Sequence, residues 1–243
     1  MNNILKDIEA RQAEFSTLPF FKFLEQGSRI EDANTFVSGL AFFILAFQDM
    51  LRINEAQITD PVLLPIAQHH RQEDLGHDIW FLHDIQKLDA DCGAALLFGE
   101  KSVQTRDTSY EIASEIYRAS DDRIRLVIPL VLEAAGHVFF SRAYHFFDRA
   151  GYTEHLKYFS REHFQAELDH EMFDQEINQR LQAVHLTDAL KQEASDVVDR
   201  IFTALIAMVS TLHNQIEQIQ LERTQLESAL DKHRQNPELA SVL

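Results

Sequence analysis

The chain has 243 residues, 45% of them hydrophobic, and its 22 Lys and Arg against 39 Asp and Glu give a formal net charge of −17. This length supports one sizeable core, and so acidic a chain without a Lys/Arg-rich patch is not expected to bind nucleic acid or an anionic membrane. A single cysteine, Cys92, excludes a disulfide framework and a cysteine-ligated zinc site.

Helical periodicity runs through almost the whole chain, and the few glycines and prolines form no linker-like stretch. Helix-start signals recur, among them Ser28-x-x-Glu31, Asp60 followed by Pro61, and Thr108-x-x-Glu111. The predicted helices are 2–15, 30–53, 60–87, 109–119, 122–150, 153–182 and 188–230. Because no alternating strand pattern competes, the sequence predicts an all-α bundle of about seven helices, in a single domain over 1–243.

The hydrophobicity of the sequence predicts neither a signal peptide for export nor a membrane-spanning helix. The first residues, MNNILKDIEARQ, are polar and lack the apolar core of a signal peptide. The longest apolar runs, such as GLAFFILAF at 39–47, are much shorter than the about 20 residues of a membrane span. We therefore expect a cytoplasmic protein with no membrane partner.

The last predicted helix continues past the core as an extension over 214–243. Its apolar residues follow alternating spacings of three and four, interrupted at Arg223: Leu212, Ile216, Ile219, Leu226 and Leu230. This is a weak coiled-coil seam. It predicts either a contact between subunits or a helix packed along its own domain, and the spacing does not choose between them.

The motif His163-x3-Glu167-x2-His170 carries the strongest chemical signal. In a helix, positions i, i+4 and i+7 share one face, and the two histidines lie roughly 10 Å apart along the axis. One metal ion can hardly reach both histidines, but two ions about 4 Å apart could each take one, with Glu167 between them. The motif predicts a dinuclear site with nitrogen and oxygen ligands.

A second stripe of candidate ligands lies in the third predicted helix. His70, Glu73 and His77 share one face, since an offset of seven residues turns the helix to within about 20° of its start. Gly76 precedes His77, and a glycine inside a helix costs about 1 kcal/mol relative to alanine. The Glu-x-x-Gly-His pattern recurs around Gly136, and such glycines indicate either the close approach of a ligand or a helix crossing.

Glu133 is a further candidate metal ligand. It follows the apolar stretch RLVIPLVL and precedes AAG. A carboxylate there needs a partner if it is buried, and we predict a metal ion. Tyr144, seven residues after His137, is the candidate catalytic side chain on the same face. Phe140 and Phe147 lie on or near that face, which indicates an apolar pocket for a small molecule.

The segment TLPFFKFLEQGSRIEDANTFVSGLAFFILAFQDML (17–51) resembles the opening of the haem-oxygenase-like superfamily, which includes the TenA thiaminases, PqqC and CADD. The likeness extends from about residue 17 to residue 213. It implies a haem-oxygenase-like helical bundle, for which a homodimer is typical.

The metal pattern is similar to that of the haem-oxygenase-like diiron oxidases and oxygenases. These carry Glu-x6-His on one helix, a Glu on a later helix, and His-x3-Asp/Glu-x2-His last. The matching positions are His77, Glu133, His163, Glu167 and His170. His70 stands where the family has its first Glu, so the resemblance implies one or two iron ions, or another metal such as manganese, with Glu73 as a substitute carboxylate.

By this resemblance the chain is a non-haem iron enzyme that activates O2 and oxidises a small organic molecule or itself. One alternative is a metal-free, TenA- or PqqC-like enzyme for a small heterocycle, and another is a CADD-like interaction protein without enzyme activity. The sequence has no histidine before His69, so its first helices cannot supply the proximal ligand of a true haem oxygenase, and Cys92 is not placed like a TenA nucleophile. Metal content separates the first hypothesis from the other two.

Overall fold

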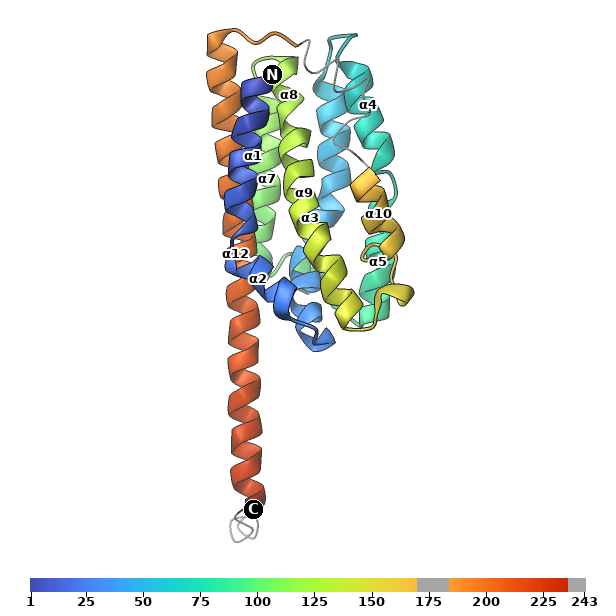
Figure 1. The fold of residues 1–243 in the computed structure, drawn as a ribbon, viewed down its shortest axis with the longest axis vertical. Helices are drawn as coiled ribbons and strands as arrows, with labels where there is room; N and C mark the ends of the chain where they lie inside the picture. The colour runs from blue at the N-terminus through green and yellow to red at the C-terminus, as the bar shows by residue number, and fades with distance from the viewer. Residues whose placement is uncertain (170–183, 236–243) are drawn as a thin grey trace.

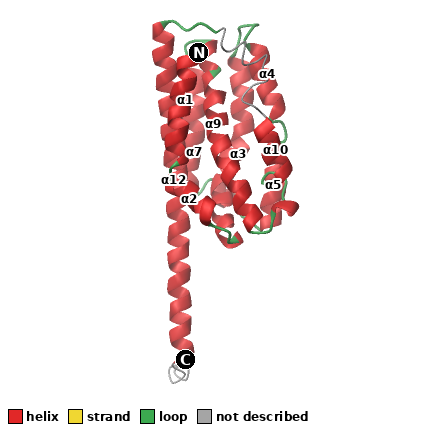
Figure 2. Cartoon of the chain, in the orientation of Figure 1, coloured by secondary structure: helices red, strands yellow, loops and turns green. Residues whose placement is uncertain are grey.

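The structure, a computed structural model, describes residues 1–169 and 184–235. Figure 2 shows that this part of the chain consists of helices joined by loops and contains no strand, so the predicted all-α fold is confirmed. In chain order the elements are α1 (Asn2–Ser16), α2 (Pro19–Gln26), α3 (Ile30–Gln57), α4 (Leu64–Glu73), α5 (His77–Leu88), α6 (Ala94–Leu97), the 3₁₀ helix η1 (Glu100–Ser102), α7 (Val103–Arg118), α8 (Asp122–Arg125), α9 (Val127–Arg149), the 3₁₀ helix η2 (Thr153–His155), α10 (Arg161–Asp169) and α12 (Asp188–Gln235).

The long helices lie side by side with their axes close to one direction (Figure 1). Helix α3 packs against α7, α4 and α5, while α9 packs against α1, α2, α10 and α12. Phenylalanines fill the space between them: Phe20, Phe21, Phe36, Phe146 and Phe147 are each 0% exposed. Several of these rings meet edge to face, an arrangement that adds about 0.5–1.5 kcal/mol per pair to the burial of apolar area.

The helix predicted at 60–87 is divided, and this is the difference that matters most for the site. Helix α4 ends at Glu73 and α5 begins at His77. Gly76 between them has φ of 94°, a left-handed conformation that side chains disfavour. Gly76 is therefore a link residue and not a glycine inside a helix, and His70 and His77 do not share the face of one continuous helix.

Replacing Gly76 by alanine should lower the free energy of unfolding by about 1–2 kcal/mol, because alanine pays for the left-handed backbone. Steric crowding adds nothing, since no atom of the described residues lies within 4 Å of an added Cβ. Gly136→Ala is the matched control: Gly136 has an ordinary backbone inside α9, so alanine there should stabilise by about 1 kcal/mol. Chemical denaturation should show that the two variants change the free energy of unfolding in opposite directions. If Gly76→Ala stabilised the protein, the left-handed backbone at Gly76 would be wrong.

Prolines account for where two other helices begin. Pro129 lies in the first turn of α9, where its missing N–H is tolerated, and the predicted helix 122–150 breaks at Leu126 just before it. Pro65 has the same place in α4. Neither proline kinks a helix interior. The short helix α2, which the sequence reading missed, also begins with a proline at Pro19.

The helix predicted from residue 153 begins only at Arg161 in the described part of the chain. In place of its expected first turns the chain forms the 3₁₀ helix η2, an extended Leu156 and a turn over residues 157–160. The expected continuation to residue 182 lies outside the described residues. Helix α7 begins at Val103, six residues before its predicted start at 109.

Helix α12 runs far beyond the body of the bundle (Figure 1). Leu212 is buried, and Arg223 reaches back to α3, where it forms a 2.9 Å ion pair with the buried Asp32. Beyond that ion pair, Leu226 and Leu230 are 62% and 52% exposed. The seam thus packs along its own domain as far as Arg223, and a subunit contact beyond it stays a prediction.

Among residues 1–169 and 184–235, two stretches are long and apolar enough to cross a membrane by length and composition alone. They are Ile30–Gln57 and Asp122–Arg149, each with a mean hydropathy of 1.6 in its most apolar window. In the first stretch 44% of that window is buried within the bundle, and in the second 61%. Both form the walls of the core described above, a position in which apolar helices are expected.

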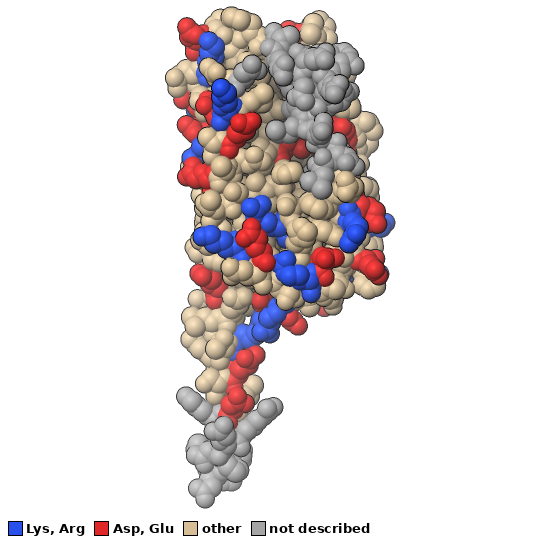
Figure 3. Space-filling view, viewed as in Figure 1, with Lys and Arg blue, Asp and Glu red and all other residues tan. Residues whose placement is uncertain are grey.

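Charged side chains are mixed on the face seen in Figure 3, where Lys and Arg lie among Asp and Glu. Two of the ion pairs tie distant parts of the chain together, Arg11 with Asp199 at 3.3 Å and Arg142 with Glu25 at 3.0 Å. No broad basic area is visible on this face.

Candidate metal centre

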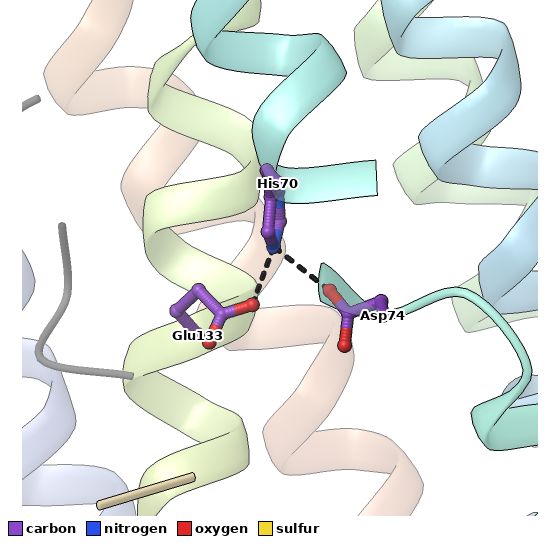
Figure 4. A group of neighbouring side chains, drawn as sticks. All are labelled: His70, Asp74 and Glu133. Atoms are coloured by element: carbon purple, nitrogen blue, oxygen red, sulfur yellow. Dashed lines mark hydrogen bonds and ion pairs between the residues drawn. The ribbon is translucent and has the colours of Figure 1, made fainter. Parts of the chain in front are cut away.

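Three possible metal ligands converge from two parts of the bundle (Figure 4). His70 lies in α4, Asp74 directly follows that helix, and Glu133 lies in α9. One donor atom of each lies within 4.8 Å of the other two. The His70 Nε2 is 2.5 Å from Glu133 Oε1 and 3.1 Å from Asp74 Oδ2. Since metal–ligand distances for these donors are about 2.0–2.2 Å, one ion fits among the three with small side-chain movements.

Asp74 is positioned by the C-terminal end of α4. The residue still has an αR backbone, with φ of −83°, so it follows His70 by one helical turn. Its side chain is 10% exposed, and its carboxylate contacts both His70 and His77, the latter at 3.1 Å. The Gln48 side chain on α3 donates a 2.7 Å hydrogen bond to the Asp74 carbonyl and fixes the link from the other side. A buried carboxylate of this kind requires such partners.

The electrostatics of the group favour a cation at its centre. Burial alone would lower the pKa of His70, but the carboxylates of Glu133 and Asp74 outweigh it and raise that pKa to about 10. The pKa of Asp74 is lowered: burial opposes this, but hydrogen bonds and charge from His70 and His77 prevail. Near neutral pH an imidazolium ion therefore lies between two carboxylates, and a divalent metal ion can replace its proton.

Two further histidines extend from this group: His77 at the start of α5 contacts Asp74, and the ring of His163 in α10 lies 4.3 Å from that of His77 between centroids. The His163 Nδ1 donates a 2.6 Å hydrogen bond to the Tyr158 carbonyl. Because a carbonyl only accepts, this bond fixes the tautomer of neutral His163 with its lone pair on Nε2. Metal-binding histidines are oriented in the same way in proteins of known structure.

Asp84 holds the segment that carries the Tyr158 carbonyl, and the sequence reading missed it. Its side chain is 0% exposed and accepts hydrogen bonds from the backbone N–H of Lys157 at 2.7 Å and of Phe159 at 3.0 Å. Asp84 follows His77 by seven residues in the same helix, so the spacing itself was the available signal. Through these bonds α5 positions both His77 and, by way of Tyr158, His163.

Asp84→Asn is expected to destabilise the fold by about 1–3 kcal/mol, because an amide has one acceptor oxygen where the buried carboxylate uses two for the N–H groups of Lys157 and Phe159. Asp148→Asn is the matched control, since Asp148 is exposed and the same change there should stay within about 0.5 kcal/mol. Denaturant titration of the two variants measures both values. Equal effects would show that Asp84 does not hold this segment.

The structure does not bring Glu73 into the group. Glu73 points away from the group and pairs with His69 at 3.1 Å, with side chains that are 36% and 45% exposed. The next residue, Asp74, supplies the carboxylate that Glu73 was expected to supply.

Tyr144, the predicted catalytic residue, is buried in α9 with its ring stacked on Phe164 at 4.8 Å and 8°. It does not line the cavity beside the metal group in the described part of the chain. His137 is exposed. Glu167 belongs to α10, but its side chain lies outside what the structure describes, and His170 lies outside the described residues altogether.

A cavity of about 100 Å³ opens beside this group. Most of its wall is apolar and comes from α1, α2, α3, α9 and α12. Asp74, His77 and Glu133 line it as well, so the candidate ligands border the same space. The site therefore combines a polar group that favours a cation with an adjoining apolar volume.

No protein-family model and no curated protein matches the chain. Two solved structures are similar in fold. A domain of unknown function with a heme oxygenase-like fold from Shewanella denitrificans OS217 superposes with a TM-score of 0.64 at 14% identity, over 90% of this chain and 94% of that one. The chain has the haem-oxygenase-like fold. A TenA homolog from Pseudomonas syringae pv. tomato DC3000 gives a TM-score of 0.62 at 9% identity, over 88% of this chain and 92% of that one.

The haem-oxygenase-like fold predicted from the sequence is thus confirmed. Identities of 9% and 14% relate backbones and carry no activity from one protein to the other. What the chain does has to be argued from its own side chains.

Proposed function

We propose that this chain is a metal-dependent redox enzyme that activates O2 at one or two non-haem iron ions. The observation that carries the proposal is the convergence of His70, Asp74 and Glu133, whose donor atoms all lie within 4.8 Å of one another. An imidazole and two carboxylates form a nitrogen and oxygen donor set without sulfur, which suits iron and also manganese.

Each side chain has a separate task in this proposal. His70, Asp74 and Glu133 would hold the first ion, and their two negative charges offset its own. His77, which contacts Asp74, and His163, whose ring lies next to His77, would provide nitrogen donors for a second ion. Iron held there supplies the one-electron chemistry that O2 reduction requires.

Aromatic side chains enclose the two outer histidines. The Trp80 ring stacks on His77 with a centroid distance of 4.9 Å, and the Phe140 and His163 rings meet edge to face with their centroids 4.7 Å apart. Such rings keep water away from the donors and restrict their rotation, and a low local dielectric strengthens the binding of a cation by carboxylates.

The alternative of a metal-free, TenA-like pocket is supported by the fold and by the apolar cavity. It lacks a cysteine nucleophile in the described wall of the cavity, because Cys92 lies in the link between α5 and α6. In a CADD-like interaction protein, the exposed end of α12 around Leu226 and Leu230 would be the surface that binds a partner.

The test is anaerobic reconstitution with Fe(II), removal of unbound iron, and exposure to O2 while absorbance and O2 consumption are recorded. We expect tight binding of one or two irons per chain and uptake of O2 with a change in absorbance. Protein loaded with Zn(II) is the control and should take up no O2, because zinc is redox-inert. Failure to bind iron or manganese would refute the proposal and favour the metal-free pocket.

A further inference from the structure

Two glycines face very different surroundings in the bundle. A Cβ added at Gly39 would lie 2.3 Å from a methyl group of the buried Leu212, so the absence of a side chain at Gly39 lets α3 approach α12 closely. A Cβ added at Gly136 would meet only the Phe140 ring among the described residues, at an ordinary 3.8 Å. Gly136 is therefore not needed for a helix crossing, although it costs α9 about 1 kcal/mol relative to alanine.

Gly136 instead lies in the wall of the cavity beside the metal group. The absent side chain leaves room next to Glu133, one turn earlier in α9. Keeping an unfavourable residue at this point makes physical sense if the space it leaves is used by a ligand.

The charges around the cavity restrict what that ligand is. The charged side chains in its described wall are Asp74, Asp78 and Glu133, with the imidazole of His77 and no Lys or Arg. An anionic group would face these carboxylates without a cation from the protein. A cationic group would compete for carboxylates that already pair with His70 and His77.

The size of the cavity sets a second restriction. A protein cavity of roughly 150 Å³ lined by apolar side chains binds benzene. At about 100 Å³, this cavity admits one small ring or a short alkyl chain but no fused polycycle. Phe139, Phe140, Leu132 and Met208 in its wall are surfaces for such a group.

We infer that the cavity lined by Gly136 binds a small uncharged apolar molecule, of at most about one ring, as the substrate held next to the metal group. The role as substrate rests on the proposed function; the binding itself does not. The ligand lies against the aromatic wall, with its reacting end toward Glu133 and Asp74.

The test uses toluene as the uncharged probe, with benzoate and benzylamine as charged counterparts of similar size. Binding is measured by calorimetry and by the shift in melting temperature, on metal-free and on metal-loaded full-length protein. We expect toluene to bind both forms, and both charged probes to bind the metal-free protein at least tenfold more weakly.

The variant Gly136→Leu fills the cavity without altering a metal donor. It should weaken toluene binding at least tenfold and leave the metal content per chain unchanged. Gly136→Ala, which adds one methyl group at ordinary contact distance, should fold in any case and weaken binding by a smaller factor. Ser114→Leu, at an exposed position on α7, controls for an added leucine and should change neither quantity.

The outcomes separate this inference from the proposed function. Iron loading without toluene binding, or toluene binding that Gly136→Leu leaves unchanged, overturns the inference and leaves the metal proposal standing. Toluene binding that is lost in Gly136→Leu, in a protein that takes up no metal, supports the pocket and refutes the metal proposal. Equal binding of benzoate or benzylamine by metal-free protein overturns the assignment of an uncharged ligand.

Discussion

Replacing Glu133 by glutamine is expected to abolish stoichiometric metal binding while the helical fold stays intact. Glutamine preserves the shape of the side chain but removes the carboxylate that lies 2.5 Å from the His70 Nε2. A neutral amide is a weak ligand for a hard cation, so the affinity for Fe(II) or Mn(II) should fall more than about 100-fold. Metal analysis after desalting measures the loss, and far-ultraviolet circular dichroism measures the helix content.

Glu73→Gln is the matched control for this experiment. It makes the same chemical change one residue away from Asp74, on a side chain that pairs with His69 away from the site. Metal content should remain at the wild-type level. Retention of metal by Glu133→Gln, or its loss in Glu73→Gln, would show that the ligands have been assigned wrongly.

The second large effect is on the pH dependence of metal affinity. Because the pKa of His70 is raised to about 10, the imidazole is protonated near neutral pH and has to lose a proton before it binds a metal. The affinity for Mn(II) should therefore increase about tenfold per pH unit, or about 100-fold between pH 6.5 and pH 8.5, with about one proton released per ion. Calorimetry in buffers of different ionisation enthalpy measures both quantities. An affinity that does not change with pH would show that His70 is not a protonated ligand.

The stability of the metal-free protein should follow the same ionisations. His70 has a folded-state pKa of about 10 against an ordinary value of 6.5. Its contribution to the free energy of unfolding is therefore fully present below pH 6.5 and is lost as the pH rises toward 10. Asp74 has a lowered pKa, so its contribution is present above its ordinary value of 3.8 and is lost as the pH falls. We expect the greatest metal-free stability between these two values, a decline above pH 6.5, and a weaker decline in metal-loaded protein.

The sequence predicted the fold, and it singled out two of the three residues that converge in the structure, His70 and Glu133. Apolar residues at helical spacing specify the bundle, and a carboxylate between apolar runs marked Glu133. His70 and His77 were recognised by their spacing. The convergence of α4 and α9 on one point depends on packing between distant segments, which spacing within one helix does not report.

Asp74 was missed because Glu73 matched the Glu-x-x-Gly-His pattern that recurs around Gly136, in a helix predicted to be continuous over 60–87. The left-handed conformation of Gly76 ends it, and a glycine in a helical pattern does not reveal its φ. Yet Asp74 is offset from His70 by about 40° around a helix and Glu73 by about 60°, so the spacing already favoured Asp74 slightly. A comparison of the angular offsets of both carboxylates from His70 predicts Asp74, the residue that the structure places in the group.

The central claim is that His70, Asp74 and Glu133 together hold a metal ion. The most direct measurement is anomalous X-ray scattering from crystals of the protein grown with Mn(II). The account predicts a peak about 2.0–2.2 Å from the His70 Nε2 and from one oxygen each of Asp74 and Glu133, with His70 no longer hydrogen-bonded to them. Crystals in which His70 still bridges the two carboxylates at saturating Mn(II), with any manganese peak elsewhere, would contradict it.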